Sequence, residues 1–271
     1  MSSLRDFMEE RDLSQELIYD TKQSAYHLIA RRKHGLCEGE MLAVGKILLD
    51  SRSLRRDEML PMLERLINCC IPNAKRKTIK DLLLNEEYHY IEPQHGKHLF
   101  NLLWSLGQAI RAHQVLRIQY MKQDASCVKR EVEPVGLMFS EFYFYLVGFI
   151  QNINKEQSFQ NPADTFPTIY RVDRINELHI LDKHFTLPYS NRFEEGEFRK
   201  RIQFMYGGRL QTVHFRYVGP SIEAILDRLP TAEVKPSSDG GWDVSAEIFG
   251  TGIEMWLKSQ GDYITKGWYY E

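Results

Sequence analysis

The chain has 271 residues, of which 43% are hydrophobic and 27% are charged, as in an ordinary globular protein with room for roughly two or three compact units. Its net charge is −2, from 35 basic and 37 acidic residues, which excludes a globally basic fold that binds nucleic acid nonspecifically. No apolar run of about 18 residues occurs and the first residues are acidic, so we expect no membrane span, no signal peptide and a cytoplasmic protein.

The cysteines indicate neither a zinc site nor a disulfide framework. There are four, and none forms a C-x-x-C pair. Cys69 and Cys70 are adjacent, a spacing that suits neither a tetrahedral metal site nor a simple disulfide. We therefore expect reduced thiols.

The first third of the chain predicts a small hairpin followed by helices. Residues 4–11 predict a short helix, and residues 15–20 and 26–30 predict two strands around a polar turn. Residues 30–40 form a charged connector, after which apolar residues recur at helical spacing.

Four helices are predicted in the next part of the chain. The first begins near Glu40, two more cover residues 57–70 and 75–85, and the fourth carries apolar residues at spacings of four, three and four. We interpret that stripe as core-facing, with a dimer seam as the alternative. The stripe consists of Leu99, Leu103, Leu106 and Ile110.

Strand-like segments replace the helical pattern at His113. Five strands in about 70 residues favour a small barrel or curled sheet, because closure removes exposed edges. A polar loop at residues 151–166 interrupts them. The predicted strands cover residues 115–120, 127–139, 142–150, 168–175 and 177–182.

The C-terminal part predicts a helix-covered sheet after a polar linker at residues 190–200. Its segments follow a β-α-β-β-α order, with helices at residues 220–229 and 252–260, which indicates an α+β unit. Residues 266–271 fit no element of this scheme.

Sequence motifs for catalysis are missing. The chain has no Walker-type phosphate loop, no H-E-x-x-H and no G-x-S-x-G, so we expect a protein that is not an enzyme and has no cofactor. The acidic run at residues 194–197 is interpreted as a solvated linker. His95 and His98 have an i, i+3 spacing but no third ligand is evident, so no metal site is expected.

Arginines and tyrosines concentrate in the segment of the five predicted strands. Alternation places Tyr143 and Tyr145 on one face of their strand. Arginine offers a planar fork to phosphate or carboxylate, and tyrosine offers a stacking face, so together they suit an anionic ligand with rings, such as a nucleotide or an oligonucleotide. The alternative is that Arg174 pairs with Asp173 or with a neighbouring acid and that Tyr145 simply packs.

The run from Val115 to Phe185 resembles the WYL domain of bacterial transcription regulators. The pieces that carry the resemblance are IQY, REVEPVGLMF, FYFYLVGF, and YRVDRI followed by HF. The Trp-Tyr-Leu of the family's name falls on Phe144, Tyr145 and Leu146. Residues 199–261 resemble the C-terminal (WCX) extension of the same regulators through LDRLP, EIFG and EMWLKSQGDYI.

The resemblance implies an α+β chain that combines a helical N-terminal region, a small Sm/SH3-like five-stranded β-barrel and a ferredoxin-like C-terminal extension. It implies a winged helix-turn-helix remnant at 1–35, a helical linker and dimerisation region at 36–112, a WYL domain at 113–189 and the extension at 196–271. It also implies a negatively charged effector, single-stranded DNA in some relatives. The ligand-binding residues carried over are Tyr120, Arg130, Tyr145, Arg171, Arg174 and, from the extension, Arg228.

The N-terminal segment departs from the family pattern. Residues 4–11 resemble only the tail of a recognition helix, and residues 15–30 resemble the wing. Since a recognition helix needs its partner helix in order to enter the major groove, we expect an N-terminally incomplete regulator that binds operator DNA poorly by itself. The expected function is a homodimeric, ligand-responsive transcription regulator. The alternative is a stand-alone accessory module that binds nucleic acid without its own operator.

Overall fold

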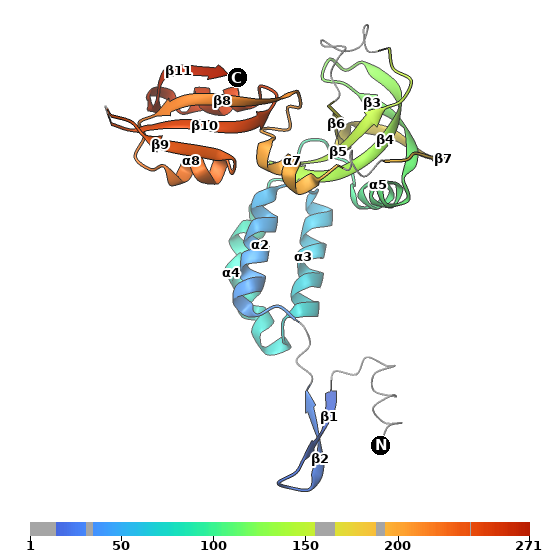
Figure 1. Cartoon of the computed structure of the whole chain (residues 1–271). Helices are drawn as coiled ribbons and strands as arrows, with labels where there is room; N and C mark the ends of the chain where they lie inside the picture. The colour runs from blue at the N-terminus through green and yellow to red at the C-terminus, as the bar shows by residue number, and fades with distance from the viewer. Residues whose placement is uncertain (1–14, 31–34, 155–165, 188–192, 239) are drawn as a thin grey trace. The chain divides into compact units, whose positions relative to one another are not determined.

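A computed structural model describes residues 15–30, 35–154, 166–187, 193–238 and 240–271 (Figure 1). The chain divides into two compact units, Met1–Gly96 and Lys97–Glu271, which are considered one at a time. The helix predicted at residues 4–11 lies outside the described residues. No helix in the described part of the chain is long and apolar enough to cross a bilayer.

The first unit contains the predicted hairpin and three of the predicted helices. Strands β1 (Gln15–Asp20) and β2 (Ala25–Ala30) pair in antiparallel fashion, as expected. The Asp20 carboxylate accepts a hydrogen bond from the Lys22 backbone N–H at 2.8 Å, which stabilises the turn. The helices are α2 (Glu38–Ser51), α3 (Arg56–Cys70) and α4 (Asn73–Tyr88).

The core of the first unit lies between these helices. Met41, Met59, Leu63 and Leu83 are fully buried. Each helix therefore buries one stripe of apolar residues, as its sequence predicts. At the start of α2, Cys37 and Glu40 form a capping box in which each side chain accepts a hydrogen bond from the other residue's backbone N–H.

The second unit begins with α5 (Phe100–Ala112) and an antiparallel sheet. Leu99 and Leu106 of the predicted stripe are buried, and α5 contacts strands of the sheet, which confirms that the stripe faces a core. The helix therefore groups with the sheet and not with the helices before it. The strands are β3 (Gln114–Met121), β4 (Cys127–Ser140), β5 (Tyr143–Ile150), β6 (Thr168–Arg171) and β7 (Ile175–His184).

The five strands form an open sheet in the order β6-β5-β4-β3-β7, so the expected closed barrel is not supported. The strand predicted at residues 168–175 ends at Arg171, because Val172–Arg174 turns into a 3-10 helix, η1, before β7 begins. No ladder therefore forms between β6 and β7, which are the two edges of the sheet.

The segment predicted as a polar linker at residues 190–200 contains a helix, α7 (Glu195–Arg201). Its Phe198 is only 4% exposed and packs in a cluster with Val135, Met138 and Val147 of the sheet. Residues 194–197 are exposed, as their interpretation as a solvated run predicts, but they begin a helix instead of an extended linker, and one buried ring fixes this charged helix against the sheet.

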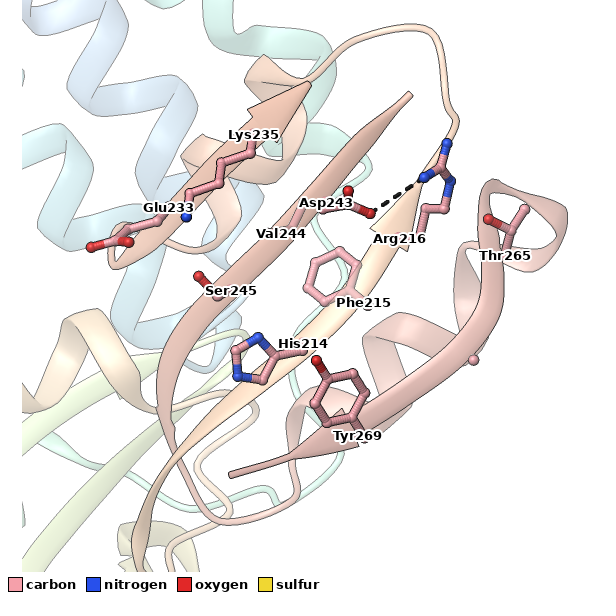
Figure 2. A pocket seen from close by; sticks show the side chains of 11 residues that line it. His214, Phe215, Arg216, Glu233, Lys235, Asp243, Val244, Ser245, Thr265 and Tyr269 are labelled. Carbon is pink, nitrogen blue, oxygen red and sulfur yellow. Dashed lines mark hydrogen bonds and ion pairs between the residues drawn. The ribbon is translucent and has the colours of Figure 1, made fainter. Parts of the chain in front are cut away.

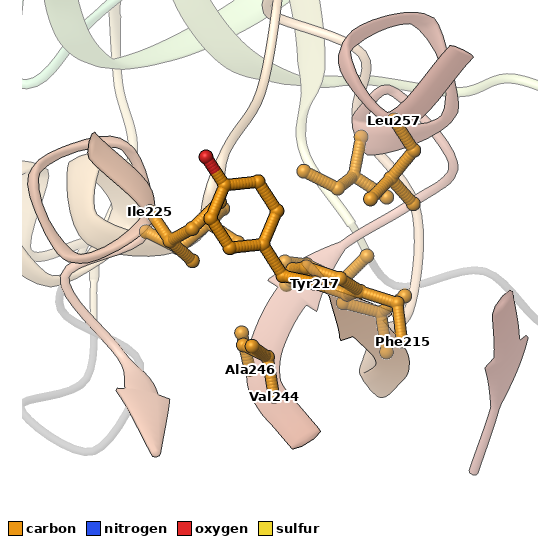
Figure 3. Packing of buried hydrophobic residues seen from close by; sticks show 10 residues of the cluster. Phe215, Tyr217, Ile225, Val244, Ala246 and Leu257 are labelled. Atoms are coloured by element: carbon orange, nitrogen blue, oxygen red, sulfur yellow. The ribbon is translucent and has the colours of Figure 1, made fainter. Parts of the chain in front are cut away.

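The C-terminal part of the second unit has the β-α-β-β-α-β order and the strand arrangement β11-β8-β10-β9 of a ferredoxin-like fold. The helices cover one face of this sheet, where Phe215, Tyr217, Val244, Ile225 and Leu257 form the core (Figure 3). The elements are β8 (Leu210–Tyr217), α8 (Glu223–Arg228), β9 (Ala232–Pro236), β10 (Trp242–Phe249), α9 (Ile253–Ser259), η3 (Gly261–Tyr263) and β11 (Ile264–Tyr270).

Strand β11 accounts for the last residues of the chain, which the sequence left unexplained. It pairs with β8, and its register shifts between Thr265 and Trp268. Gly267 lies in this shift with a φ of 70°, a backbone conformation that glycine adopts without steric cost. The resulting bulge breaks the alternation by which a strand is recognised.

Candidate anion-binding site

Arg171 lies against two tyrosines at the junction of β5 and β6. Tyr145 is the cross-strand partner of Arg171. The guanidinium carbon of Arg171 lies 3.5 Å from the centroid of the Tyr143 ring, a cation–π contact. The backbone N–H of Arg171 donates to the Tyr120 hydroxyl at 3.3 Å. The structure thus brings the predicted residues Tyr120, Tyr145 and Arg171 together.

The guanidinium of Arg171 is also held by an acid. Its Nε donates to Oδ1 of Asp173 at 3.1 Å and its Nη2 donates to Oδ2 at 2.7 Å. Asp173 is only 5% exposed. Burial alone would lower the pKa of Arg171, but hydrogen bonding to the Asp173 carboxylate raises it overall. The acid therefore pairs with Arg171, and not with Arg174 as the alternative interpretation had it.

Arg174 lies in η1, one residue beyond Asp173, and is half-buried. Within the described residues it makes no hydrogen bond or ion pair. Its charge is therefore not balanced by the acid next to it in the sequence, which leaves it available to a ligand.

Arg130 lines a different pocket from the other predicted residues. It projects from β4 into a cavity of about 270 Å³, together with Lys129, Gln151 and Asn152. Its Nη1 donates to the backbone oxygen of Lys129 at 3.2 Å. Its positive charge nevertheless opposes the rise that burial causes in the pKa of Tyr170, whose ring packs against Tyr120, so Arg130 lies near the Tyr120 side of the cluster while it lines this other cavity.

Arg228 lines a cavity of about 330 Å³ that holds a second group of cations. Its guanidinium carbon lies 4.7 Å from the centroid of the Phe204 ring, and its Nη1 lies 3.8 Å from Oε1 of Glu141. We call this cavity the Arg228 pocket. Its lining comprises Ser140, Glu141, Arg199, Lys200, Ile202, Gln203, Phe204, Asp227, Arg228 and Pro230.

The charge of this lining is net positive by one, since Arg199, Lys200 and Arg228 outnumber Glu141 and Asp227, and Lys200 also pairs with Glu197 outside the lining. Arg199, Lys200 and Phe204 were not predicted as site residues, because residues 190–200 were interpreted as a linker and Phe204 follows directly after them. The run FRKRIQF, in which three adjacent cations stand between two aromatic rings, was the available signal.

Glu141 connects the Arg228 pocket with the tyrosines of β5. Burial raises the pKa of Tyr145; the positive charge of Arg171 opposes this shift, and the negative charge of Glu141 is one of those that add to it. Glu141 is thus close enough to influence Tyr145 while it also contacts Arg228. The turn between β4 and β5 therefore lies between the two groups of cations.

The backbone beside the Arg228 pocket adopts an unusual conformation. Phe204 and Met205 are consecutive non-glycine residues with φ values of 50° and 56°. Such residues cost roughly 1–3 kcal/mol each and cluster at functional sites. The segment also packs on both sides, because Met205 belongs to the cluster on the sheet while Phe204 contacts Arg228 of α8.

Within the described ranges, no group of three or more His, Cys, Asp or Glu residues is arranged so that it could hold a metal ion. The four cysteines are all unpaired.

Residues 101–180 match the WYL domain family. The match begins in α5, ends in β7, and includes every predicted ligand-binding residue except Arg228. No curated protein matches the chain.

One solved structure with detectable similarity is proteasome accessory factor B/C (PafBC) of Arthrobacter aurescens, at 14% identity and a TM-score of 0.32. The alignment covers 88% of this chain and 33% of that chain, so this chain spans about a third of the protein that it matches. The similarity to the WYL domain family is thus confined to residues 101–180, which run from α5 through the open sheet into β7.

Proposed function

We propose that the chain is a WYL-domain regulatory protein, and not an enzyme, that binds a phosphate-bearing effector in the Arg228 pocket. The effector is a nucleotide or a short single-stranded DNA. The observation that carries the proposal is the net positive lining of that pocket beside the tyrosines and Arg171 of the WYL sheet.

The side chains of the pocket match the chemistry of such a ligand. Arginine binds phosphate oxygens through two parallel N–H donors. Apart from its contact with the Phe204 ring, the Arg228 guanidinium has only a long 3.8 Å ion-pair contact with Glu141, so a phosphate would meet it with little competition. The Phe204 ring beside it offers an apolar face to a base or a ribose.

Three elements meet at the pocket, and this supports a role in signalling. Its residues come from the β4–β5 turn, from α7 with the segment after it, and from α8. An effector shifts a conformational equilibrium only through its different affinity for two states. In our proposal the bound effector favours one arrangement of the strained Phe204–Met205 segment, and this controls DNA binding by a homodimer through an attached winged helix.

Two substitutions that should change the affinity for the effector in opposite directions test the effector site. Arg228→Met keeps the apolar stem but removes the charge, and we expect it to weaken binding of a fluorescein-labelled single-stranded DNA about ten-fold or more, since a hydrogen bond to a charged group contributes about 1.5–3 kcal/mol. Glu141→Gln removes the competing acid and should tighten binding. Fluorescence anisotropy measures both affinities.

Salt dependence provides a second measure on the same samples. For single strands the slope of log K against log salt is about −0.7 for each phosphate neutralised, so Arg228→Met should make it shallower by about that amount. Matching affinities for the wild type and both variants would contradict the proposal. Lys122→Met, at an exposed lysine outside the pocket, is the control for nonspecific charge.

A further inference from the structure

The C-terminal sheet has a second cavity, away from its helices. Helices α8 and α9 cover the face that carries Phe215, Tyr217 and Val244. Asp243 and Ser245 alternate with Val244 along β10 and point to the other face. A trough of about 380 Å³ crosses the strands there (Figure 2). Its volume is in the range of small-molecule sites.

The register of the four strands arranges the lining side chains in two rows. In the first row Glu233, Ser245, His214 and Tyr269 lie directly opposite one another on β9, β10, β8 and β11. In the second row the corresponding residues are Lys235, Asp243, Arg216 and Thr265. Neighbouring strands lie about 4.8 Å apart, so a ring and its substituents fit along one row.

The first row ends in a stacking platform. The His214 and Tyr269 rings are stacked, with centroids 4.8 Å apart and planes within 13°. Because His214 lies between Tyr269 and Ser245 in the row, the face of the His214 ring that does not contact Tyr269 is turned toward Ser245 and a ligand there. An aromatic ring that stacks on such a platform gains binding energy whatever its identity.

The β9 and β10 side of the trough offers unused hydrogen-bonding groups from both rows. The side chains of Glu233, Ser245 and Lys235 make no hydrogen bond or ion pair with the described part of the chain, although all three line the trough. A carboxylate accepts from an exocyclic amine, a hydroxyl both donates and accepts, and an ammonium donates. These groups match the edge of a nucleobase.

The charge of the trough distinguishes a base from a polynucleotide. The lining cations, Arg216 and Lys235, are balanced by Glu233 and Asp243. Arg216 donates to the Asp243 carboxylate at 3.4 Å, to the backbone oxygen of Gly240 and to the Ser237 hydroxyl. The carboxylate of Glu271 lies 3.3 Å from the His214 ring. A polyphosphate therefore finds no net positive charge here.

We propose that this trough binds a nucleoside or free nucleobase, with the base stacked on the His214 ring, which Tyr269 supports from behind, and its hydrogen-bonding edge on Ser245 and Glu233. The proposal goes beyond the effector site and does not depend on it, because no residue of the Arg228 pocket lines the trough. Purines that carry an exocyclic amine, such as adenosine, are favoured over inosine, which lacks it.

Isothermal titration calorimetry of the full chain with adenosine, inosine, adenosine monophosphate and a short single-stranded DNA tests the proposal. We expect adenosine to bind more tightly than inosine, and the monophosphate to bind no more tightly than adenosine. His214→Ala should weaken adenosine binding at least about five-fold, the lower end for loss of one stacked aromatic, and Tyr269→Ala, which removes the ring behind His214, should weaken it less. Ser245→Val keeps a strand-favouring side chain and should also weaken binding.

The matched control is Tyr88→Ala in the first unit. Tyr88 is 73% exposed and also contacts a histidine ring, His89, but it does not line the trough, so adenosine affinity should not change. Arg228→Met should leave it unchanged as well, which separates this site from the effector site. Absence of adenosine binding at millimolar concentration, equal affinities of His214→Ala and wild type, or preference for single-stranded DNA over adenosine would each overturn the proposal.

Discussion

Replacement of Arg171 by alanine should destabilise the second unit, whatever ligand the protein binds. The substitution leaves the carboxylate of Asp173, which is 5% exposed, without the guanidinium that donates two hydrogen bonds to it. Breaking a buried ion pair from one side costs about 3–5 kcal/mol. Lys97 is also close enough for the Asp173 charge to raise its pKa, against the larger lowering by burial. Because this second cation partly offsets the loss, we expect about 3 kcal/mol.

Urea denaturation followed by tryptophan fluorescence measures this loss. All four tryptophans, at positions 104, 242, 256 and 268, belong to the unit Lys97–Glu271, so the signal reports its unfolding alone. The double variant Arg171→Met with Asp173→Leu removes both charges and should recover most of the stability, since apolar replacements of a buried pair are often neutral. Breaking a buried pair costs about 3–5 kcal/mol, so a loss of unfolding free energy below about 1 kcal/mol for Arg171→Ala would contradict this prediction. A double variant whose loss equals the sum of the losses of its two single variants would also contradict it.

Two further predictions concern packing and capping. In Gly148→Ala the new Cβ would lie 2.5 Å from Cγ1 of Val132 and 2.7 Å from the backbone oxygen of Glu133, so we expect a loss of about 1–3 kcal/mol from overpacking, measured by the same fluorescence assay; unchanged stability would contradict the close approach of β4 and β5. Cys37→Ser replaces the Sγ that accepts from the Glu40 N–H at 3.5 Å with a better N-cap acceptor, so the first unit should gain about 0.5 kcal/mol, seen as a higher midpoint by circular dichroism; a lower midpoint would contradict the capping role of this residue.

The sequence predicted the fold where periodicity was uninterrupted. The hairpin, helices α2 to α5 and strands β3 to β5 lie close to their expected positions, because each buries one regular set of apolar residues. The elements that it missed have weak periodicity. Helix α7 buries one aromatic residue among charges, and the alternation of β11 is broken at Gly267.

The candidate site was predicted less well than the fold. Proximity of Arg171 to Tyr145 followed from strand pairing, as expected. The choice of partner for Asp173 did not, because the residues after Arg171 form a 3-10 helix and side-chain alternation does not continue through it. The grouping of Arg199 and Lys200 with Arg228 depends on contacts between residues far apart in sequence, which no local pattern encodes.

The structural role of Arg171 limits which variants can test ligand binding. Loss of binding in Arg171→Ala would not distinguish a missing contact from a destabilised sheet. Arg174→Ala removes a charge with no ion pair among the described residues, and Arg228→Met removes one with only a long contact. These two are the informative substitutions.

Photo-crosslinking with a nucleotide that carries an azido base, followed by mass spectrometry of the labelled peptides, tests the effector site most directly. The account predicts label on the peptides that contain the β4–β5 turn, residues 199–204 or residues 227–230, and loss of that label in Arg228→Met. Label that persists unchanged in Arg228→Met, or that appears only on other parts of the chain, would contradict the assignment of the Arg228 pocket as the effector site.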